Sequence, residues 1–346
     1  MTAHTTLDAS MADFISGLPK CELHLHLEGT LAPELKLKLA QRNGIDIGQS
    51  SVAEVEATYA FDSLTSFLAI YYPAMNVLQT EEDFFDLAYE YLTKAKSQGV
   101  RHAEMFFDPQ AHTSRGVPFP TVIGGYRRAV ITARRELGIS AELIMCFLRD
   151  RSADFAMATL MDALPYKDWI IGVGLDSDER GNPPSKFAAV FARARKEGFM
   201  LTMHCDIDQE NSIEHIRQCL EDIRVDRIDH GTNIVENPAL VEEAKGRGIG
   251  FTCCPVSNSF VTSDMKATEI VQLLRHGVQV TVNSDDPAYF GGYMTENYES
   301  LAGFAQLSKQ EVKDLAANAF GIAWISTKAR DTFLAELNTY CAPFGV

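Results

Sequence analysis

The sequence lacks the features that would place it in a membrane or in an oxidising compartment. Its apolar runs stay short of the ~18 residues that a membrane-spanning helix needs. Residues 1–13 contain neither the basic nor the continuous apolar segment of a secretory leader. The seven cysteines are odd in number and form no Cys-x-x-Cys pair. Because most of them lie within apolar runs, we expect reduced core thiols in a soluble, cytoplasmic protein with no membrane partner.

Basic residues are also scarce. Lys and Arg total 31 against 47 Asp and Glu, which gives a formal net charge of -16. An acidic surface of this kind repels nucleic-acid phosphates and anionic lipids. We therefore expect no nucleic-acid partner, and a small neutral or weakly basic substrate is favoured.

What the chain does contain is a regular alternation of two kinds of segment. Eight short apolar, β-branched or aromatic runs end in polar residues, at 21–28, 100–108, 141–150, 169–176, 199–206, 227–230, 248–255 and 278–286. Amphipathic segments typical of helices lie between them, at 81–98, 119–137, 152–164, 185–197, 213–223, 238–247 and 266–276. Alternation of this kind requires a parallel sheet, and eight repeats predict an α/β fold, a (β/α)8 barrel of the TIM type.

Residues 31–80 are too many for one barrel helix. We expect them to form extra N-terminal helices that cover the active-site end of the barrel. No low-complexity segment or charge run marks an internal boundary. Residues 1–346 are therefore expected to form one domain.

Two histidines alternate with leucines in Leu-His-Leu-His-Leu-Glu-Gly at residues 23–29. Residues two apart in a strand point to the same side, so His24 and His26 can bind one metal ion together. A helix would point them about 200° apart. The alternative is a pair of polar residues on one face of a half-buried strand.

Further histidines and acids fall where the predicted strands end, which is where barrel enzymes place their active sites. These residues are His204 after the fifth run, His230 after the sixth, and Asp285 and Asp286 after the eighth. Three neutral imidazoles and a carboxylate suit zinc, with iron or cobalt as competitors. The metal would lower the pKa of water from ~15.7 to roughly 7, and His230 is free to orient or deprotonate that water.

Each of these residues also has a simpler interpretation. His204 could be an isolated core histidine, His230 could cap a helix, and Asp285-Asp286-Pro287 could form a turn with a helix N-cap. These interpretations do not explain why all of them fall at strand ends. The other internal histidines lie away from strand ends or on expected helices and are expected to be structural or surface groups: His102, His112, His215 and His276.

At these residues the chain resembles the adenosine and adenine deaminase family of the metal-dependent amidohydrolase superfamily. Four further segments resemble its free-base adenine deaminase branch: Phe-Phe-Asp-Pro-Gln at 106–110, Gly-Leu-Asp-Ser at 174–177, Pro-Pro-Ser-Lys-Phe at 183–187 and Cys-Pro-Val-Ser-Asn at 254–258. The resemblance implies zinc bound by four residues: His24, His26, His204 and Asp285. It also implies that His230 works on the nucleophilic water and that Asp286 and Gly174 contact the purine. Residues Ser177 to Glu179 are expected to offer a further backbone or side-chain contact to the purine ring.

The same resemblance favours a free base over a nucleoside. Nucleoside deaminases tend to have Asp, which receives a ribose hydroxyl, at the position of Glu28. The longer Glu28 side chain, shared with the free-base branch, would occupy part of the ribose space. The implied reaction is hydrolytic deamination at C6 of a small-molecule purine, adenine or an N6-substituted adenine of cytokinin type, to hypoxanthine.

One motif departs from the family. Its fifth strand normally ends in His-Ala-Gly-Glu, whose glutamate protonates a purine ring nitrogen, whereas this chain has Cys-Asp-Ile-Asp-Gln-Glu after His204. Asp206, Asp208 and Glu210 are the candidates for the general acid. We favour Asp206, which lies nearest the histidine, and then Asp208, which alternation places on the same side. The alternative is that these acids are solvated loop residues or helix caps.

Three other functions are compatible with parts of the sequence. One is deamination of adenosine, and another is a non-catalytic purine-binding protein that has lost the acid. A third is a two-metal amide or ester hydrolase. The third often uses a carboxylated lysine on the fourth strand, where residues 169–176 contain none.

Overall fold

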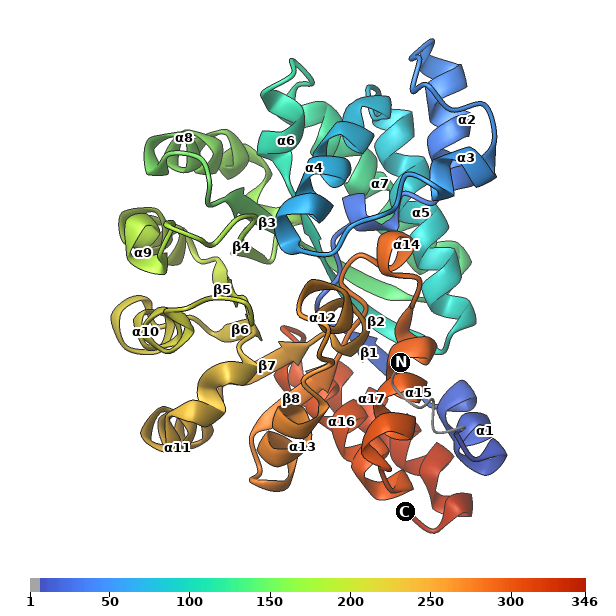
Figure 1. Cartoon of the computed structure of the whole chain (residues 1–346), viewed down its shortest axis with the longest axis vertical. Helices are drawn as coiled ribbons and strands as arrows, with labels where there is room; N and C mark the ends of the chain where they lie inside the picture. The colour runs from blue at the N-terminus through green and yellow to red at the C-terminus, as the bar shows by residue number, and fades with distance from the viewer. Residues whose placement is uncertain (1–6) are drawn as a thin grey trace.

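The computed structural model describes residues 7–346, so residues 1–6 of the N-terminal segment lie outside it. Eight strands follow one another around a parallel sheet in chain order: β1 (Lys20–Glu22), β2 (Val100–Phe107), β3 (Ser140–Leu148), β4 (Gly172–Asp176), β5 (Met200–Cys205), β6 (Arg227–His230), β7 (Gly250–Cys253) and β8 (Gln279–Val282). The helices surround this sheet (Figure 1). The predicted (β/α)8 barrel is confirmed.

The described helices include those that the amphipathic segments predicted, with ends shifted by a few residues. The α-helices are α1 (Ala9–Gly17), α2 (Pro33–Asn43), α3 (Val52–Glu56), α4 (Leu64–Ala74), α5 (Glu81–Ser97), α6 (Pro109–Thr113), α7 (Phe119–Glu136), α8 (Ala153–Ala163), α9 (Ala188–Glu197), α10 (Ser212–Arg217), α11 (Pro238–Arg247), α12 (Pro255–Val261), α13 (Ala267–Arg275), α14 (Pro287–Phe290), α15 (Met294–Ala305), α16 (Lys309–Ile322) and α17 (Thr327–Cys341). None of the helices in the described part of the chain has both the length and the apolar character of a membrane span.

The first strand is shorter than the predicted run of residues 21–28. After Glu22 the backbone leaves the ladder and makes only isolated bridges, from Leu25 to Asp285 and from His26 to Phe106. Two hydrogen bonds close the barrel there, from His26 N–H to the Asp285 carbonyl and from Asp285 N–H to the His24 carbonyl, each at 3.0 Å. The barrel therefore closes at the His-x-His segment itself.

The segment between β1 and α5 contains α2, α3 and α4, and α4 contributes to the wall of the cavity at the carboxyl ends of the strands. The α4 helix begins at a capping box in which Ser63 and Ser66 satisfy each other's backbone N–H groups. Phe67 and Tyr71 lie one turn apart on its buried face. Both line the cavity at the carboxyl ends of the strands.

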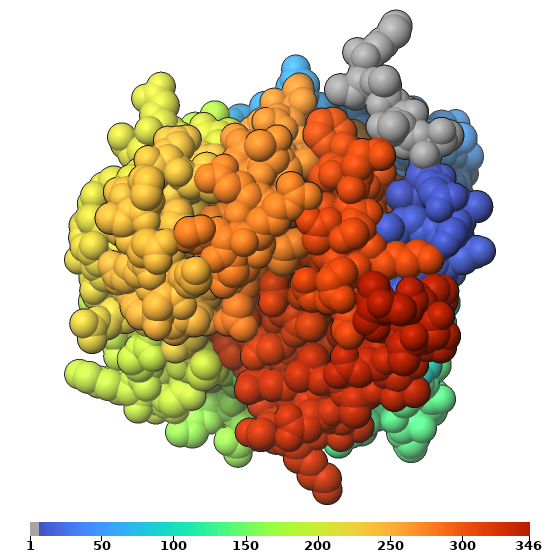
Figure 2. Space-filling view, turned by 90° about the horizontal axis from the view of Figure 1, so that it is seen from below, coloured from blue at the N-terminus to red at the C-terminus, as the bar shows by residue number. Residues whose placement is uncertain are grey.

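The C-terminal residues, for which the sequence predicted no elements, form α14 to α17. The α16 helix packs against β8 and β1 and completes the ring of helices. Figure 2 shows the C-terminal helices (red) beside the α13 region (orange) on one face of the molecule, with α1 (blue) next to them. All seven cysteines are buried and unpaired, as expected of reduced core thiols.

Candidate active site

The four predicted metal ligands come together at the barrel mouth. Asp285 Oδ1 lies 3.3 Å from His24 Nε2 and 3.5 Å from His26 Nε2. His26 Nε2 and His204 Nε2 are 3.1 Å apart. His24 Nε2 is buried and has no hydrogen-bond partner within residues 7–346. A set of imidazole nitrogens aimed at one carboxylate oxygen fits a divalent metal ion.

Asp229, to which the sequence assigned no role, orients the His24 imidazole through Thr252. Its two carboxylate oxygens accept the hydroxyl hydrogens of Thr252 at 2.8 Å and Thr202 at 2.7 Å. The Thr252 oxygen lies 2.9 Å from His24 Nδ1, so Nδ1–H must be the donor there. This tautomer leaves the His24 Nε2 lone pair facing the ligand cluster, as metal-binding histidines require.

The electrostatic surroundings keep most of the imidazoles neutral. Burial lowers the pKa of His26 and of His230 to about 4, and lowers the pKa of His204 well below its ordinary value. Burial also acts on His24, but the Asp285 and Asp229 carboxylates outweigh it and raise its pKa. Neutral imidazole is the form that binds a metal.

Three residues at this end of the barrel have left-handed backbone conformations. The φ angles are 56° at His230, 64° at Asp285 and 72° at Ser177. Residues other than glycine adopt this region at an energetic cost, and such residues cluster at functional sites. In these backbone conformations His230 and Asp285 lie side by side, with His230 Nε2 at 3.8 Å from Asp285 Oδ2.

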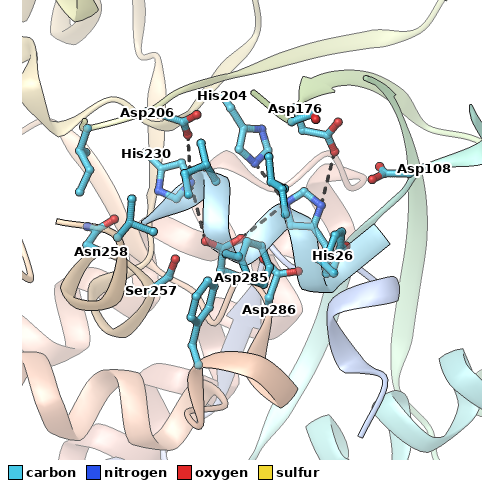
Figure 3. A pocket seen from close by; sticks show the side chains of 18 of the residues that line it. His26, Asp108, Asp176, His204, Asp206, His230, Ser257, Asn258, Asp285 and Asp286 are labelled. Atoms are coloured by element: carbon cyan, nitrogen blue, oxygen red, sulfur yellow. Dashed lines mark hydrogen bonds and ion pairs between the residues drawn. The ribbon is translucent and has the colours of Figure 1, made fainter. Parts of the chain in front are cut away.

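These groups form the floor of a cavity at the carboxyl ends of the strands. Its walls come from α4, α12, α14 and the strand ends (Figure 3). The lining residues are His26, Leu64, Phe67, Leu68, Tyr71, Tyr72, Asp108, Asp176, Ser177, His204, Asp206, Ile207, His230, Ser257, Asn258, Val261, Asp285, Asp286 and Phe290. The lining combines aromatic and aliphatic side chains with five carboxylates, and it includes neither Lys nor Arg from residues 7–346. This lining suits a flat ligand rich in hydrogen-bond donors.

The three candidate acids after His204 differ in position. Asp206 lines the cavity, with Oδ1 3.8 Å from His230 Nε2. Burial and the neighbouring Glu179 raise the pKa of Asp206 well above its ordinary value. Asp208 and Glu210 are exposed, and Asp208 Oδ1 accepts a hydrogen bond from Gln209. The structure thus brings only Asp206 of these three to the cavity.

A buried network from two other loops holds the Asp206 segment. Glu179 Oε2 accepts the Asp206 backbone N–H at 2.7 Å, and Oε1 lies 2.5 Å from His215 Nδ1. Arg149 Nη1 lies 3.3 Å from Glu179 Oε2 and donates to the His204 carbonyl at 2.8 Å. Glu179 does not line the cavity, because this network occupies its carboxylate.

Two of the predicted substrate-binding residues do not line the cavity. Glu28 is buried, and its Oε1 accepts hydrogen bonds from His112 Nε2 at 2.8 Å and from the Tyr126 hydroxyl at 2.9 Å. Gly174 lies within β4, where a Cβ would meet Cys146 Sγ at 2.5 Å. Glycine therefore serves strand packing at position 174. The other two predicted residues, Ser177 and Asp286, do line the cavity.

Asp286 depends on the glycine of the His-Leu-Glu-Gly segment for its position. A Cβ on Gly29 would lie 2.0 Å from Asp286 Oδ1 and 2.8 Å from its Cα. The short 3-10 turn Glu28–Thr30 thus passes directly over Asp286. Only glycine leaves room for this approach.

Sequence reasoning missed two cavity carboxylates, Asp108 and Asp176. They follow or end β2 and β4, so they satisfy the same strand-end criterion that selected His204 and His230. Asp176 Oδ2 lies 3.5 Å from His26 Nδ1. The criterion would have found both residues had it been applied to acids at every strand end.

Comparison with known proteins gives the family. The adenosine deaminase family model matches residues 19–340. The chain belongs to the adenosine deaminase family. It is 52% identical over 332 residues to an uncharacterized deaminase of Schizosaccharomyces pombe, covering 96% of this chain and 98% of that protein. It is 48% identical over 331 residues to an adenine deaminase of Acinetobacter baylyi, covering 95% and 99%.

Solved structures agree with this assignment. The adenine deaminase of Arthrobacter aurescens superposes with a TM-score of 0.90 at 41% identity, covering 94% of this chain and 99% of that one. An amidohydrolase from Burkholderia ambifaria, solved with bound zinc, has a TM-score of 0.88 at 27% identity, covering 99% and 96%.

Proposed function

We propose that the protein is a metal-dependent aminohydrolase that deaminates a free aminopurine base, with adenine as the principal substrate. One observation carries the proposal: His230 and Asp206 lie side by side at the cavity, next to a cluster of imidazoles gathered on Asp285. The similarity to proteins named adenine deaminases over nearly the whole chain supports it.

We further propose that the resident metal is zinc, bound by His24, His26, His204 and Asp285. The buried, unpartnered His24 Nε2 and the neutral state of the other imidazoles fit a borderline divalent ion. The zinc in the Burkholderia ambifaria relative supports the same choice. When bound, such an ion supplies hydroxide at neutral pH by lowering the pKa of water to about 7.

The remaining chemistry belongs to the side chains of the cavity. His230 is placed to orient the attacking water and to take up its proton. Asp206 is placed to deliver a proton to a ring nitrogen of the purine, which offsets the charge that builds up when C6 is attacked. Asp286 lines the cavity and is placed to contact the purine ring. Addition of water at C6 and loss of ammonia then convert adenine to hypoxanthine.

The preference for a free base follows from the surroundings of Glu28. His112 and Tyr126 occupy Glu28 Oε1, and the residue is fully buried outside the cavity wall. The expectation that Glu28 fills part of the ribose space is therefore wrong, and the preference rests instead on the absence of a Glu28 oxygen at the cavity wall to receive a ribose hydroxyl. Tyr71 and Tyr72 line the cavity on the α4 side.

A substrate panel tests this proposal. Purified, metal-replete protein is incubated with adenine, adenosine and N6-methyladenine, and hypoxanthine, inosine and the released amine are quantified by chromatography. We expect hypoxanthine from adenine at a kcat/KM far above that for inosine formation from adenosine. Absence of hypoxanthine from both bases would overturn the proposal, and dominant inosine formation would redirect it to the nucleoside.

Metal analysis tests the choice of ion separately. We expect close to one zinc per chain in the purified protein and its loss in His204→Ala. Serine at Ser114, an exposed loop position, offers a control: Ser114→Ala should retain the metal. Iron or cobalt at that stoichiometry would contradict the choice of zinc without affecting the assignment of the ligands.

A further inference from the structure

Asp108 is a buried carboxylate of the cavity for which the mechanism above has no use. It follows β2 and is 1% exposed. Within residues 7–346, its Oδ1 has no hydrogen-bond partner. Burial of an unpaired carboxylate oxygen costs free energy, so a group of this kind is expected to find its partner in a ligand.

Local structural roles do not explain this side chain. Asp108 precedes Pro109 at the start of α6, where an aspartate commonly caps a helix, but its side chain makes no capping bond. Its backbone N–H is directed to Glu28 Oε1 at 3.4 Å. The neighbouring Asp176 is turned to His26, whose Nδ1 is 3.5 Å from Asp176 Oδ2. Asp108 also lines the cavity beside Asp176, close enough for the two carboxyl groups to share a hydrogen, and burial together with Asp176 raises the pKa of Asp108 well above its ordinary value.

The cavity surface around Asp108 calls for a hydrogen-bond donor on the ligand. In the described part of the chain, no Lys or Arg side chain lines the cavity to balance its carboxylates. The hydroxyl oxygens of Ser177 and Tyr71, also on the cavity wall, are buried and lack partners within the described residues. These two hydroxyl groups indicate that a polar ligand completes this wall.

The position of Asp108 relative to the reacting groups identifies the donor. In Figure 3, His230 and Asp206 lie at one side of the labelled residues and Asp108 at the other, with His26, Asp285 and Asp286 between them. This step rests on the proposed function. A purine whose C6 faces His230 and Asp206 extends its five-membered ring away from them, towards the Asp108 side. In a free base that ring carries an N–H, which a nucleoside replaces with the bond to ribose.

We propose that Asp108 is a specificity-determining residue that accepts the ring N–H of the free base. Its Oδ1, which has no partner within the described residues, gains one when this hydrogen is present. A nucleoside would leave Asp108 Oδ1 without that partner and would force a sugar against a buried carboxyl group. Sites built to hydrogen-bond a polar hydrogen reject analogues that lack it by about 10⁴- to 10⁵-fold.

The test compares adenine with 9-methyladenine, in which a methyl group replaces the hydrogen. We expect wild-type protein to favour adenine in kcat/KM by at least about 10²-fold. In Asp108→Ala this ratio should fall at least tenfold, because adenine loses its acceptor while 9-methyladenine gains space. Asp108→Asn keeps an acceptor oxygen and should retain most of the preference. Asp150→Ala, in the exposed turn after β3, is the matched control and should keep the wild-type ratio.

The outcomes separate the inference from the proposed function. Equal losses for the two bases in Asp108→Ala, with the ratio unchanged, would overturn the role of Asp108 while the proposed function stands. If wild-type protein deaminates neither base, the proposed function fails. Calorimetric binding of adenine and 9-methyladenine to wild type and Asp108→Asn then gives the same ratio without turnover. Equal affinity of wild type for both bases would overturn the inference.

Discussion

Glu179 on the loop after β4 accepts the backbone N–H of Asp206 at the end of β5, with 2.7 Å between Oε2 and the nitrogen. Arg149, from the end of β3, joins the pair by contacting Glu179 and the His204 carbonyl. Three consecutive strands thus fix the backbone on both sides of Cys205. This arrangement ties the candidate acid to the candidate metal ligand two residues before it.

Replacing Glu179 should therefore impair catalysis through the position of Asp206. In Glu179→Gln, Arg149 loses its buried carboxylate partner. The single side-chain oxygen of Gln can accept a hydrogen bond from the Asp206 N–H or face His215, but it cannot do both as the two Glu179 oxygens do. We expect kcat for adenine to fall by about 10²-fold, because a small displacement of a reacting group costs about that much in rate. The change in KM should be smaller. Steady-state kinetics and zinc content are the measurements. Glu221→Gln, on the exposed surface beside Arg217, is the control. A loss of zinc that accounts for the whole effect would contradict a positioning role.

Asp206 and Asp208 provide a matched pair for the general acid. Asp206→Asn should lower kcat by about 10²- to 10⁴-fold, the usual contribution of a positioned acid, with the metal still bound. Asp208→Asn should change kcat by less than about threefold, because an exposed group away from the reacting atoms contributes little. The reverse order would assign the acid to Asp208 and would require the loop to close over the substrate.

The fold was predictable because each strand and helix has a local signal. The helix of residues 238–247, for example, begins at a proline after Asn237 and ends at Gly248, and the structure reproduces its bounds. The first strand was predicted too long because alternation of Leu and His continues to residue 27. The backbone there leaves the ladder to bridge both β8 and β2, and periodicity within one segment carries no information about such partners.

The site was predictable only in part for a related reason. His24, His26, His204 and Asp285 have side chains that mark them at strand ends, and closure of the barrel brings them together. The Glu179 and Arg149 pair joins two loops, and each residue alone resembles an ordinary surface charge in sequence. His112 and His215, expected to be structural, support Glu28 and Glu179. The roles of the two histidines depend on contacts with residues 84 and 36 positions away in the sequence.

The close approach of Gly29 to Asp286 gives a steric prediction. In Gly29→Ala the new Cβ would overlap Asp286 Oδ1 and press on its backbone, so Asp286 must move. We expect kcat/KM for adenine to fall by about 10²-fold. The control is Gly246→Ala in α11, where a Cβ meets nothing within 4 Å. That variant should keep full activity and gain roughly 0.5–1 kcal/mol of stability from helix propensity. Wild-type kinetics in Gly29→Ala would show that Asp286 tolerates displacement.

Glu104 and Arg227 form a buried ion pair within the barrel, with Oε2 and Nη1 2.6 Å apart and both side chains fully buried. The Arg227 guanidinium also lies 4.2 Å from the centre of the Trp324 ring. Burial acts to raise the pKa of Glu104, but Arg227 and His102 outweigh it and hold the pKa below its ordinary value of 4.5. The ionised form therefore stabilises the fold.

The pH dependence of unfolding should reveal this pair. Because the folded-state pKa lies below the unfolded value, the contribution is complete above about pH 5 and is lost as the pH falls through the folded pKa. Glu104→Gln removes the nearer carboxylate of Arg227 and leaves only the longer contact of 3.9 Å between Arg227 Nε and Asp229 Oδ1, so we expect a loss of at most about 3–5 kcal/mol in the free energy of unfolding at pH 7. Denaturant titrations from pH 7 to pH 3 should show the difference from wild type narrowing towards acid. Glu336→Gln, which removes a partly exposed partner of Arg101, should cost less than about 1 kcal/mol. A difference that stays constant with pH would mean that Glu104 contributes through packing and neutral hydrogen bonds, such as the one that it accepts from the Trp324 backbone.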